Sequence, residues 1–134
     1  MPARLRFLVC IATMAMATAC ATTNMVRIEP NVAVDSLVFH VSAAGEPNNP
    51  GVLAYGLSVL ACVDDRAFWT ISADGTRAMP QDVRYGSPIP GFPTNTGPLP
   101  LVPGCYDVIV SGGARTRFTV TAARRVVPRD TSRL

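Results

Sequence analysis

The chain has 134 residues and a formal net charge of +3, and 49% of its residues are hydrophobic. Residues 1–19 hold 14 apolar residues and two arginines, so the other 115 residues carry 10 arginines against 9 acidic residues. This remainder has the length of one domain and a charge near zero. Because it lacks the strong basic excess typical of nucleic-acid binding, we expect no nucleic-acid partner.

The N-terminal segment has the pattern of an export signal. Residues 1–6 carry two arginines and no acid, and residues 7–19 carry no charge. A helix that spans a bilayer needs about 20 apolar residues, so these 13 are too few for a stable span. A basic start followed by a short apolar stretch is typical of a leader that is removed after export.

The leader ends in Ala17-Thr18-Ala19-Cys20, which resembles the lipobox of bacterial lipoproteins. The resemblance implies that Cys20 receives diacylglycerol on its sulfur, that cleavage falls just before it, and that palmitate-like acyl chains form the anchor. Ala21, in place of an aspartate, implies the outer membrane, at its periplasmic face or surface. The alternative is ordinary secretion, with Ala17-Thr18-Ala19 as a signal-peptidase site.

The remaining cysteines fit an exported protein. Once Cys10 leaves with the leader and Cys20 is lipidated, Cys62 and Cys105 are left as one pair. In an oxidising compartment this pair predicts a disulfide, with two separately buried thiols as the alternative. Two cysteines and one distant histidine do not complete a zinc site, so we expect no metal and no cofactor.

Alternating apolar residues predict an all-β domain, a small antiparallel β-sandwich, over residues 25–123. Residues 20–24 would be the lipidated cysteine and a short tether, and residues 124–134 a basic flexible tail. The expected strands cover residues 25–28, 36–41, 52–63, 67–72, 83–85, 106–110 and 117–121. For residues 52–63 the alternative is a helix, since Leu53, Leu57 and Leu60 have helical spacing.

Turn residues set the expected connections between these strands. Asp74-Gly75 is a hairpin dipeptide, so the strand over 67–72 should end there and residues 76–79 should return. From Gly86 to Gly104, ten of nineteen residues are proline or glycine, which predicts a long loop without a central strand.

The segment Leu101-Val102-Pro103-Gly104-Cys105-Tyr106-Asp107-Val108 resembles the entry to a late strand in Ig-like and transthyretin-like β-sandwiches. The resemblance implies a Pro-Gly turn that feeds a strand whose tyrosine packs at the sandwich edge. It covers about twenty residues and bears on fold, because many unrelated proteins share such sandwiches. Pro80–Gly86 is also similar to a segment of small bacterial envelope proteins, a similarity that implies no activity.

His40 is the first residue to consider for acid–base chemistry, since it is the single histidine of the chain. Its strand places it on the face opposite Phe39, toward solvent. A catalytic triad would need Ser42, Ser58 or Ser72 beside it, and no G-x-S-x-G motif is present. We therefore predict no catalytic residue.

Other polar and aromatic residues have simple structural interpretations. Asp64-Asp65 fits a solvated turn better than a calcium site, and Trp69 fits the core. Tyr85 and Phe92, at and inside the Pro/Gly loop, are the predicted contact residues for a partner, because exposed aromatic tips on rigid loops suit binding. The C-terminal arginines either contact anionic lipid or form a solvated face and tail; these are Arg115, Arg117, Arg124, Arg125, Arg129 and Arg133.

Together these features predict a lipid-anchored, non-enzymatic domain of the cell envelope that binds a protein or a cell-wall component. One alternative is a periplasmic inhibitor that acts through the Pro/Gly loop. Another is a small envelope hydrolase or accessory enzyme, which would need a cleft that joins His40 to Asp64 or Asp65.

Overall fold

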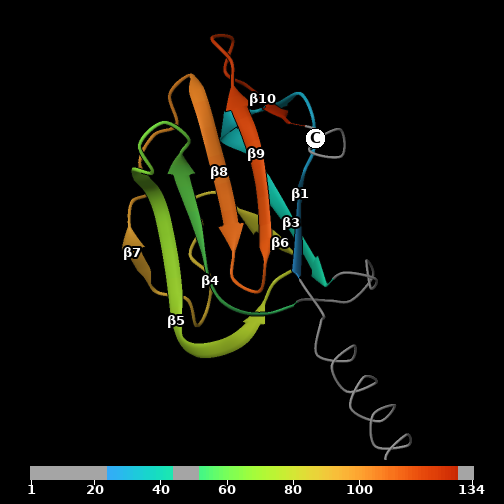
Figure 1. The fold of residues 1–134 in the computed structure, drawn as a ribbon, viewed down its shortest axis with the longest axis vertical. Helices are drawn as coiled ribbons and strands as arrows, with labels where there is room; N and C mark the ends of the chain where they lie inside the picture. Colours follow the sequence, from blue (N-terminus) through green and yellow to red (C-terminus); the bar gives the residue numbers. More distant parts are fainter. Residues whose placement is uncertain (1–23, 44–51, 130–134) are drawn as a thin grey trace, which may run out of the picture.

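The computed structural model describes residues 24–43 and 52–129, which form two antiparallel sheets packed face to face (Figure 1). The smaller sheet has the order β1-β3-β6, with strands Asn24–Ile28, Val38–Ala43 and Asp82–Arg84. The larger has the order β2-β10-β9-β8-β4-β5-β7, with strands Val32–Ala33, Arg125–Pro128, Ala114–Val120, Gly104–Val110, Val52–Ala61, Ala67–Met79 and Thr94–Thr96. A short 3-10 turn, η1, covers Val34–Ser36. The predicted all-β sandwich is confirmed.

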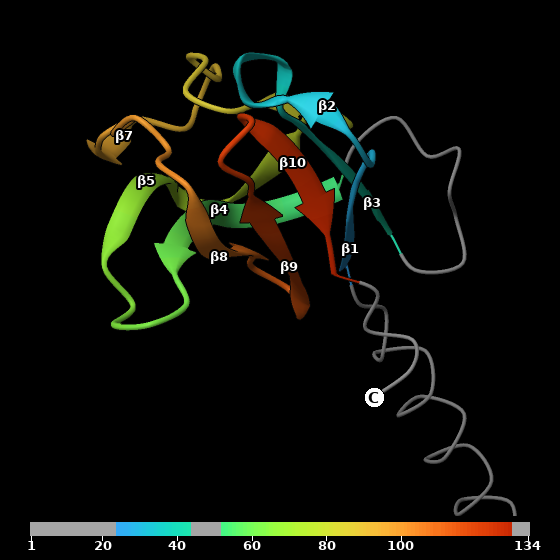
Figure 2. The ribbon, with the colours of Figure 1, turned by 90° about the horizontal axis from the view of Figure 1, so that it is seen from above.

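The core lies between the two sheets, as the strand periodicity predicts. In β3, Phe39 and Val41 are fully buried, while Val38 and His40 on the other face remain half-buried. Aromatic rings join the sheets: Phe39 of the small sheet lies 6.1 Å from Phe118 of the large one, centroid to centroid. Seen from above, β1 and β3 lie side by side to the right of β9 and β10 (Figure 2).

The β8–β9 hairpin forms where the sequence predicts it. Tyr106, Val108 and Val110 point into the core from β8, and Phe118 and Val120 meet them from β9. The Tyr106 hydroxyl donates a hydrogen bond to the Val102 carbonyl oxygen at 2.6 Å. A tyrosine bonded back to the chain just upstream is the corner expected at the edge of such sandwiches.

The predicted hairpin at Asp74-Gly75 is wrong. Strand β5 runs through this dipeptide to Met79 and pairs with β4 on both sides of it. The register passes from Gly56 opposite Ser72 to Ala54 opposite Arg77, so β5 holds three extra residues in a bulge. Asp74-Gly75 fits a bulge as well as a hairpin turn, because both require a backbone conformation outside the regular strand range, which Gly75 adopts with a φ of 92°. Figure 1 shows β5 curving beneath β4 after the bulge.

The predicted flexible tail is wrong over residues 125–128. Strand β10 pairs with β9 and with β2, and Val126 is fully buried. Beyond it, the Arg129 amide donates to the Arg117 carbonyl at 2.8 Å. The sequence gives little sign of this strand, because its apolar pair, Val126-Val127, directly follows two arginines, Arg124 and Arg125. Residues 130–134 lie outside the described part of the chain.

The Pro/Gly segment is a loop with one short strand at the edge of the large sheet. Strand β7 pairs with β5 at the end of the sheet order, through Thr96 opposite Thr70 and Thr94 opposite Ile71. An edge position tolerates the prolines on either side because they need no ladder partner there. The prediction that this segment holds no central strand is confirmed.

Candidate functional site

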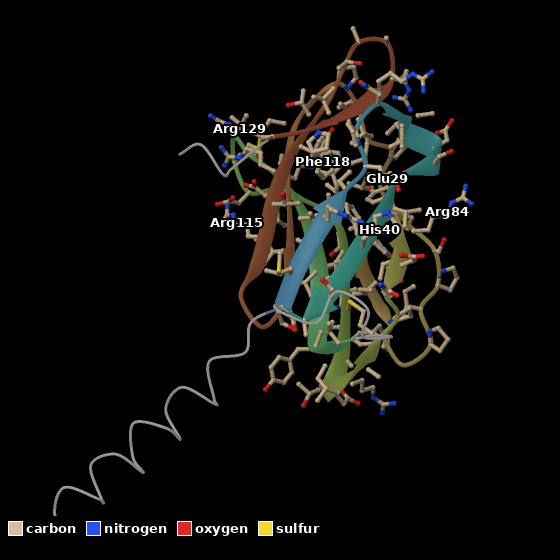
Figure 3. The ribbon with its side chains drawn as sticks, turned by 90° about the vertical axis from the view of Figure 1, so that its right-hand side faces the viewer. Glu29, His40, Arg84, Arg115, Phe118 and Arg129 are labelled. Atoms are coloured by element: carbon tan, nitrogen blue, oxygen red, sulfur yellow. A yellow bond between two sulfur atoms is a disulfide. The ribbon has the colours of Figure 1, made fainter. Side chains whose placement is uncertain are left out.

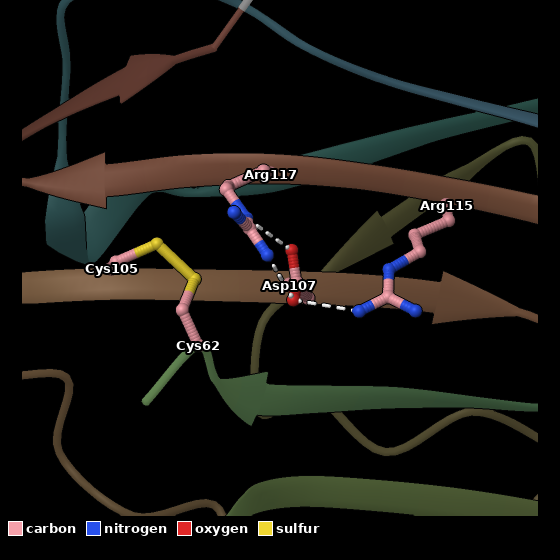
Figure 4. A network of polar contacts seen from close by, with 5 residues as sticks. All are labelled: Cys62, Cys105, Asp107, Arg115 and Arg117. Carbon is pink, nitrogen blue, oxygen red and sulfur yellow. Dashed lines mark hydrogen bonds and ion pairs between the residues drawn. A yellow bond between two sulfur atoms is a disulfide. The ribbon is translucent and has the colours of Figure 1, made fainter. Parts of the chain in front are cut away.

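Cys62 and Cys105 form a disulfide, as the cysteine count predicts (Figure 4). Cys62 follows β4 and Cys105 lies in β8, the neighbouring strand, and their Cα atoms are 5.4 Å apart. The Cys62 amide also donates to the Cys105 carbonyl at 3.0 Å. The bond therefore closes a 43-residue separation at a point where the two strands already pair.

Beside the disulfide, Asp107 forms an ion-pair cluster on the outer side of β8 (Figure 4). Its two carboxylate oxygens accept hydrogen bonds from Arg117 Nε at 2.9 Å and Nη2 at 3.2 Å. Arg115 Nη2 donates a third, at 2.9 Å. The bonds from Arg117 are the main reason that the pKa of Asp107 lies below its ordinary value, and those from Arg115 add to the effect. Both carboxylate oxygens of Asp107 thus accept hydrogen bonds from side chains of the hairpin, and the cluster stabilises the pairing of β8 with β9.

The two predicted contact residues are not exposed aromatic tips, and this correction concerns both. Phe92 is only 2% exposed and belongs to the core. Tyr85 is partly buried against the core, and its hydroxyl donates to the Leu99 carbonyl at 2.6 Å. The loop folds back onto the sandwich, because removing the large apolar surface of an aromatic ring from water stabilises the folded chain. The inhibitor hypothesis thereby loses the exposed tip on which it depended.

The interpretations of Trp69 as a core residue and of Asp64-Asp65 as a solvated turn are confirmed. Trp69 is fully buried and lies edge-on to Tyr85 at 5.3 Å, although its indole N–H has no hydrogen-bond partner within the described part of the chain. Asp64 and Asp65 lie in the exposed turn after β4, and Asp64 Oδ1 accepts a bond from the Arg66 amide.

Most of the described C-terminal arginines have defined partners within the fold. Besides the two on Asp107, Arg124 Nη1 donates to the Leu101 carbonyl at 2.9 Å and Arg125 Nη1 to the Asn31 carbonyl at 3.1 Å. Arg115, Arg124 and Arg125 nevertheless remain exposed, so the solvated face agrees with the prediction, while residues 125–128 form a strand in place of the predicted tail. Arg133 lies outside the described residues.

The outer face of the small sheet holds a further polar cluster, centred on His40 (Figure 3). His40 Nδ1 lies 2.7 Å from Asp82 Oδ1 on the neighbouring strand β6, and Nε2 lies 3.7 Å from Glu29 Oε1, just after β1. The two carboxylates approach the imidazole from different strands, because register places His40 between Arg27 and Asp82. We call this surface the His40 face and define it by Met25, Arg27, Glu29, His40, Ser42, Asp82 and Arg84.

Two hollows adjoin His40 on this face. One, of about 310 Å³, is lined by Met25, Arg27, Ser42 and Gln81 together with His40. The other, of about 230 Å³, is lined by Glu29, Ser36, Val38 and Asp82 with His40. Small-molecule pockets usually enclose about 300–1,000 Å³, so the first hollow is at the lower end of this range and the second is below it.

The His40 face has the chemistry of a recognition surface. Glu29 and Asp82 are exposed acceptors, Arg27 and Arg84 are exposed donors, and each ring nitrogen of His40 donates or accepts according to the tautomer. A catalytic triad would need a serine hydroxyl beside His40, but both ring nitrogens face carboxylates. Of the serines considered for this role, Ser58 and Ser72 belong to the other sheet. Neither hollow beside His40 is lined by Asp64 or Asp65, so the cleft required by the hydrolase hypothesis is not formed there.

The sequence suggested His40 as an exposed polar residue but not its partners. Asp82 is 42 residues away, and no local signal places it opposite His40. Asp107 was missed for a different reason. The turn at Ser111–Gly113 fixes the hairpin register, and counting outward from it would have placed Arg117 opposite Asp107.

Comparison of the chain with protein-family models, curated proteins and solved structures gives no match. Among residues 24–43 and 52–129, no three His, Cys, Asp or Glu side chains are grouped so that they could hold a metal ion. Over the same residues, no helix has the length and apolarity needed to cross a membrane. The predicted leader and Cys20 lie outside the described residues.

Proposed function

We propose that the protein is a lipid-anchored binding domain of the cell envelope, anchored through Cys20 and without catalytic activity. The observation that carries the proposal is the Cys62–Cys105 disulfide. Structural disulfides persist in exported proteins and are rare in reducing compartments. With Cys62 and Cys105 assigned to this bond, Cys20 is the remaining one of the three cysteines of the sequence after residue 19, at the position that lipidation requires.

The His40 face is the proposed contact surface for a protein or cell-wall partner. It replaces the Pro/Gly loop in this role, because that loop buries Phe92 and holds the Tyr85 hydroxyl internally. Donors and acceptors alternate across three strands on this face, with two hollows between them. Such a rigid surface can bind a polar partner without first becoming ordered.

The anchor is tested by metabolic labelling of the full chain with radioactive palmitate in a Gram-negative host. The wild-type chain should incorporate label and yield an N-terminal peptide whose mass includes diacylglycerol. Cys20→Ser should incorporate none, and Cys10→Ser, the matched control within the leader, should be labelled like the wild type. Labelling that survives Cys20→Ser would show that the anchor is not at this cysteine.

The contact surface is tested by a photo-crosslinking amino acid introduced in the native host. Arg27 lines the larger hollow and stands opposite His40, whereas Val127 is exposed on β10 of the other sheet. A discrete crosslinked product should form from position 27 and not from position 127. It should disappear when His40→Ala is added. Equal products from both positions would exclude the His40 face as the specific surface.

A further inference from the structure

Large apolar side chains are exposed at the end of the sandwich where β1 begins. Leu53 is 68% exposed, Tyr55 57% and Met25 53%. An exposed leucine and an exposed tyrosine two residues apart on β4 point to the same side of the strand. Two large apolar side chains exposed side by side on one strand face suit a contact with a protein or a membrane.

The N-terminal residue of β1, Asn24, is bonded at this same end of the sandwich. The Asn24 side-chain amide donates to the Leu53 carbonyl at 3.1 Å and to the Ser111 carbonyl at 2.8 Å. The Ser111 hydroxyl in turn accepts a bond from the Tyr55 amide at 2.6 Å. These bonds fix the first described residue beside Leu53 and Tyr55. Figure 1 shows the start of β1 and the β8–β9 turn at the lower end of the sandwich, opposite the β4–β5 turn.

The length of chain before Asn24 limits how far this end can lie from a lipid at Cys20. Four residue steps separate Cys20 from Asn24, so a fully extended connection spans at most about 14 Å. The tether therefore keeps Leu53 and Tyr55 at a high effective concentration near the bilayer surface, where weak contacts suffice to orient the domain. Tyrosine suits this position, since its ring favours the boundary between headgroups and acyl chains.

We propose that this end of the sandwich lies on the bilayer, with Leu53 and Tyr55 inserted at the boundary between headgroups and acyl chains and Met25 at its rim. This inference rests on the proposed anchor at Cys20. It also places the larger hollow of the His40 face close to the membrane, because Met25 and Ser42 line that hollow.

The test uses the lipidated full chain in phosphatidylethanolamine–phosphatidylglycerol vesicles whose acyl chains carry bromine, a quencher of tryptophan fluorescence. Tyr55→Trp places a reporter at the proposed contact, and Val63→Trp places one in the β4–β5 turn at the other end, where Val63 is 92% exposed. The native Trp69 is fully buried and contributes the same background to both variants. Thermal unfolding of each variant verifies that it is folded.

The Tyr55→Trp reporter should lose about half of its fluorescence on brominated vesicles, as expected for an indole at the membrane interface. The Val63→Trp reporter should be unchanged. Flotation of the vesicles separates the two proposals. Protein that does not float with them refutes the anchor, whereas floating protein with no quenching at position 55, or equal quenching at both positions, overturns the orientation alone.

Discussion

Asp107 and Arg117 face each other across β8 and β9, and the guanidinium donates to both carboxylate oxygens. Arg115 donates a further hydrogen bond to the same carboxylate. Asp107 is therefore only 2% exposed, although it lies on the outer side of the sheet. A carboxylate shielded in this way depends on its arginines, because an ion removed from water needs compensating bonds.

Replacing Asp107 by asparagine should destabilise the domain by about 2 kcal/mol, since charge-assisted hydrogen bonds are lost and a neutral amide remains. Urea unfolding followed by circular dichroism measures the change. Asp74→Asn, an exposed residue in the β5 bulge, is the matched control and should have almost no effect. Equal effects of the two substitutions would contradict the role assigned to the Asp107 cluster.

Acid should weaken the domain through the same residue. The pKa of Asp107 is lower in the folded chain than in the unfolded chain, where about 3.9 is usual, chiefly because Arg117 donates to the charged form. The unfolded state therefore takes up the proton first, and the stabilisation present above about pH 4 is lost as the pH falls. The melting temperature should fall less steeply below pH 4 for Asp107→Asn than for the wild type. Parallel curves would exclude this linkage.

The disulfide should contribute about 4 kcal/mol to stability, as the loop-entropy relation gives for a separation of 43 residues. The double substitution Cys62→Ser with Cys105→Ser should lower the free energy of unfolding by this amount. Reduction of the wild-type chain should give the same loss, and the double variant should not respond to the reductant. A wild-type stability that does not change on reduction would contradict the prediction.

The sequence predicts those strands in which one face packs on the core and the other faces solvent. Phe39 and Val41, or Tyr106 and Val108, alternate with polar residues, and this period alone fixes which side is buried. Strand β10 was missed because it is a short strand whose burial depends on pairing with β9 on one side and with β2 on the other. The His40–Asp82 contact likewise arises from the pairing of β3 with β6, which no local pattern encodes.

Loop composition predicts that Tyr85 is exposed, but composition does not show which side chains the loop packs against. The Tyr85 hydroxyl bonds to the Leu99 carbonyl while its ring packs on Trp69. Burial, followed by the influence of Tyr106, raises the pKa of Tyr85 from 10.0 to about 12. The unfolded state therefore releases its proton first, and stability should fall as the pH rises from about 10 to about 12.

Tyr85→Phe should reduce this alkaline loss, while costing about 1 kcal/mol at neutral pH for the missing hydrogen bond. Urea unfolding at a series of pH values measures both effects. Tyr55→Phe, at an exposed position, is the matched control and should leave the alkaline profile as in the wild type. An identical profile for Tyr85→Phe would show that Tyr85 is not the group responsible.

Gly56 marks the place where β4 meets the bulge of β5. A Cβ atom added there would collide with the Ile71 carbonyl oxygen, which is backbone and cannot swing aside. Gly56→Ala should therefore destabilise the domain by about 1–3 kcal/mol, the usual cost of overpacking. Ser58→Ala, two residues along the same strand, is the control and should cost much less. Urea unfolding compares the two, and an unchanged stability for Gly56→Ala would mean that β4 and β5 do not approach as closely at the bulge as described.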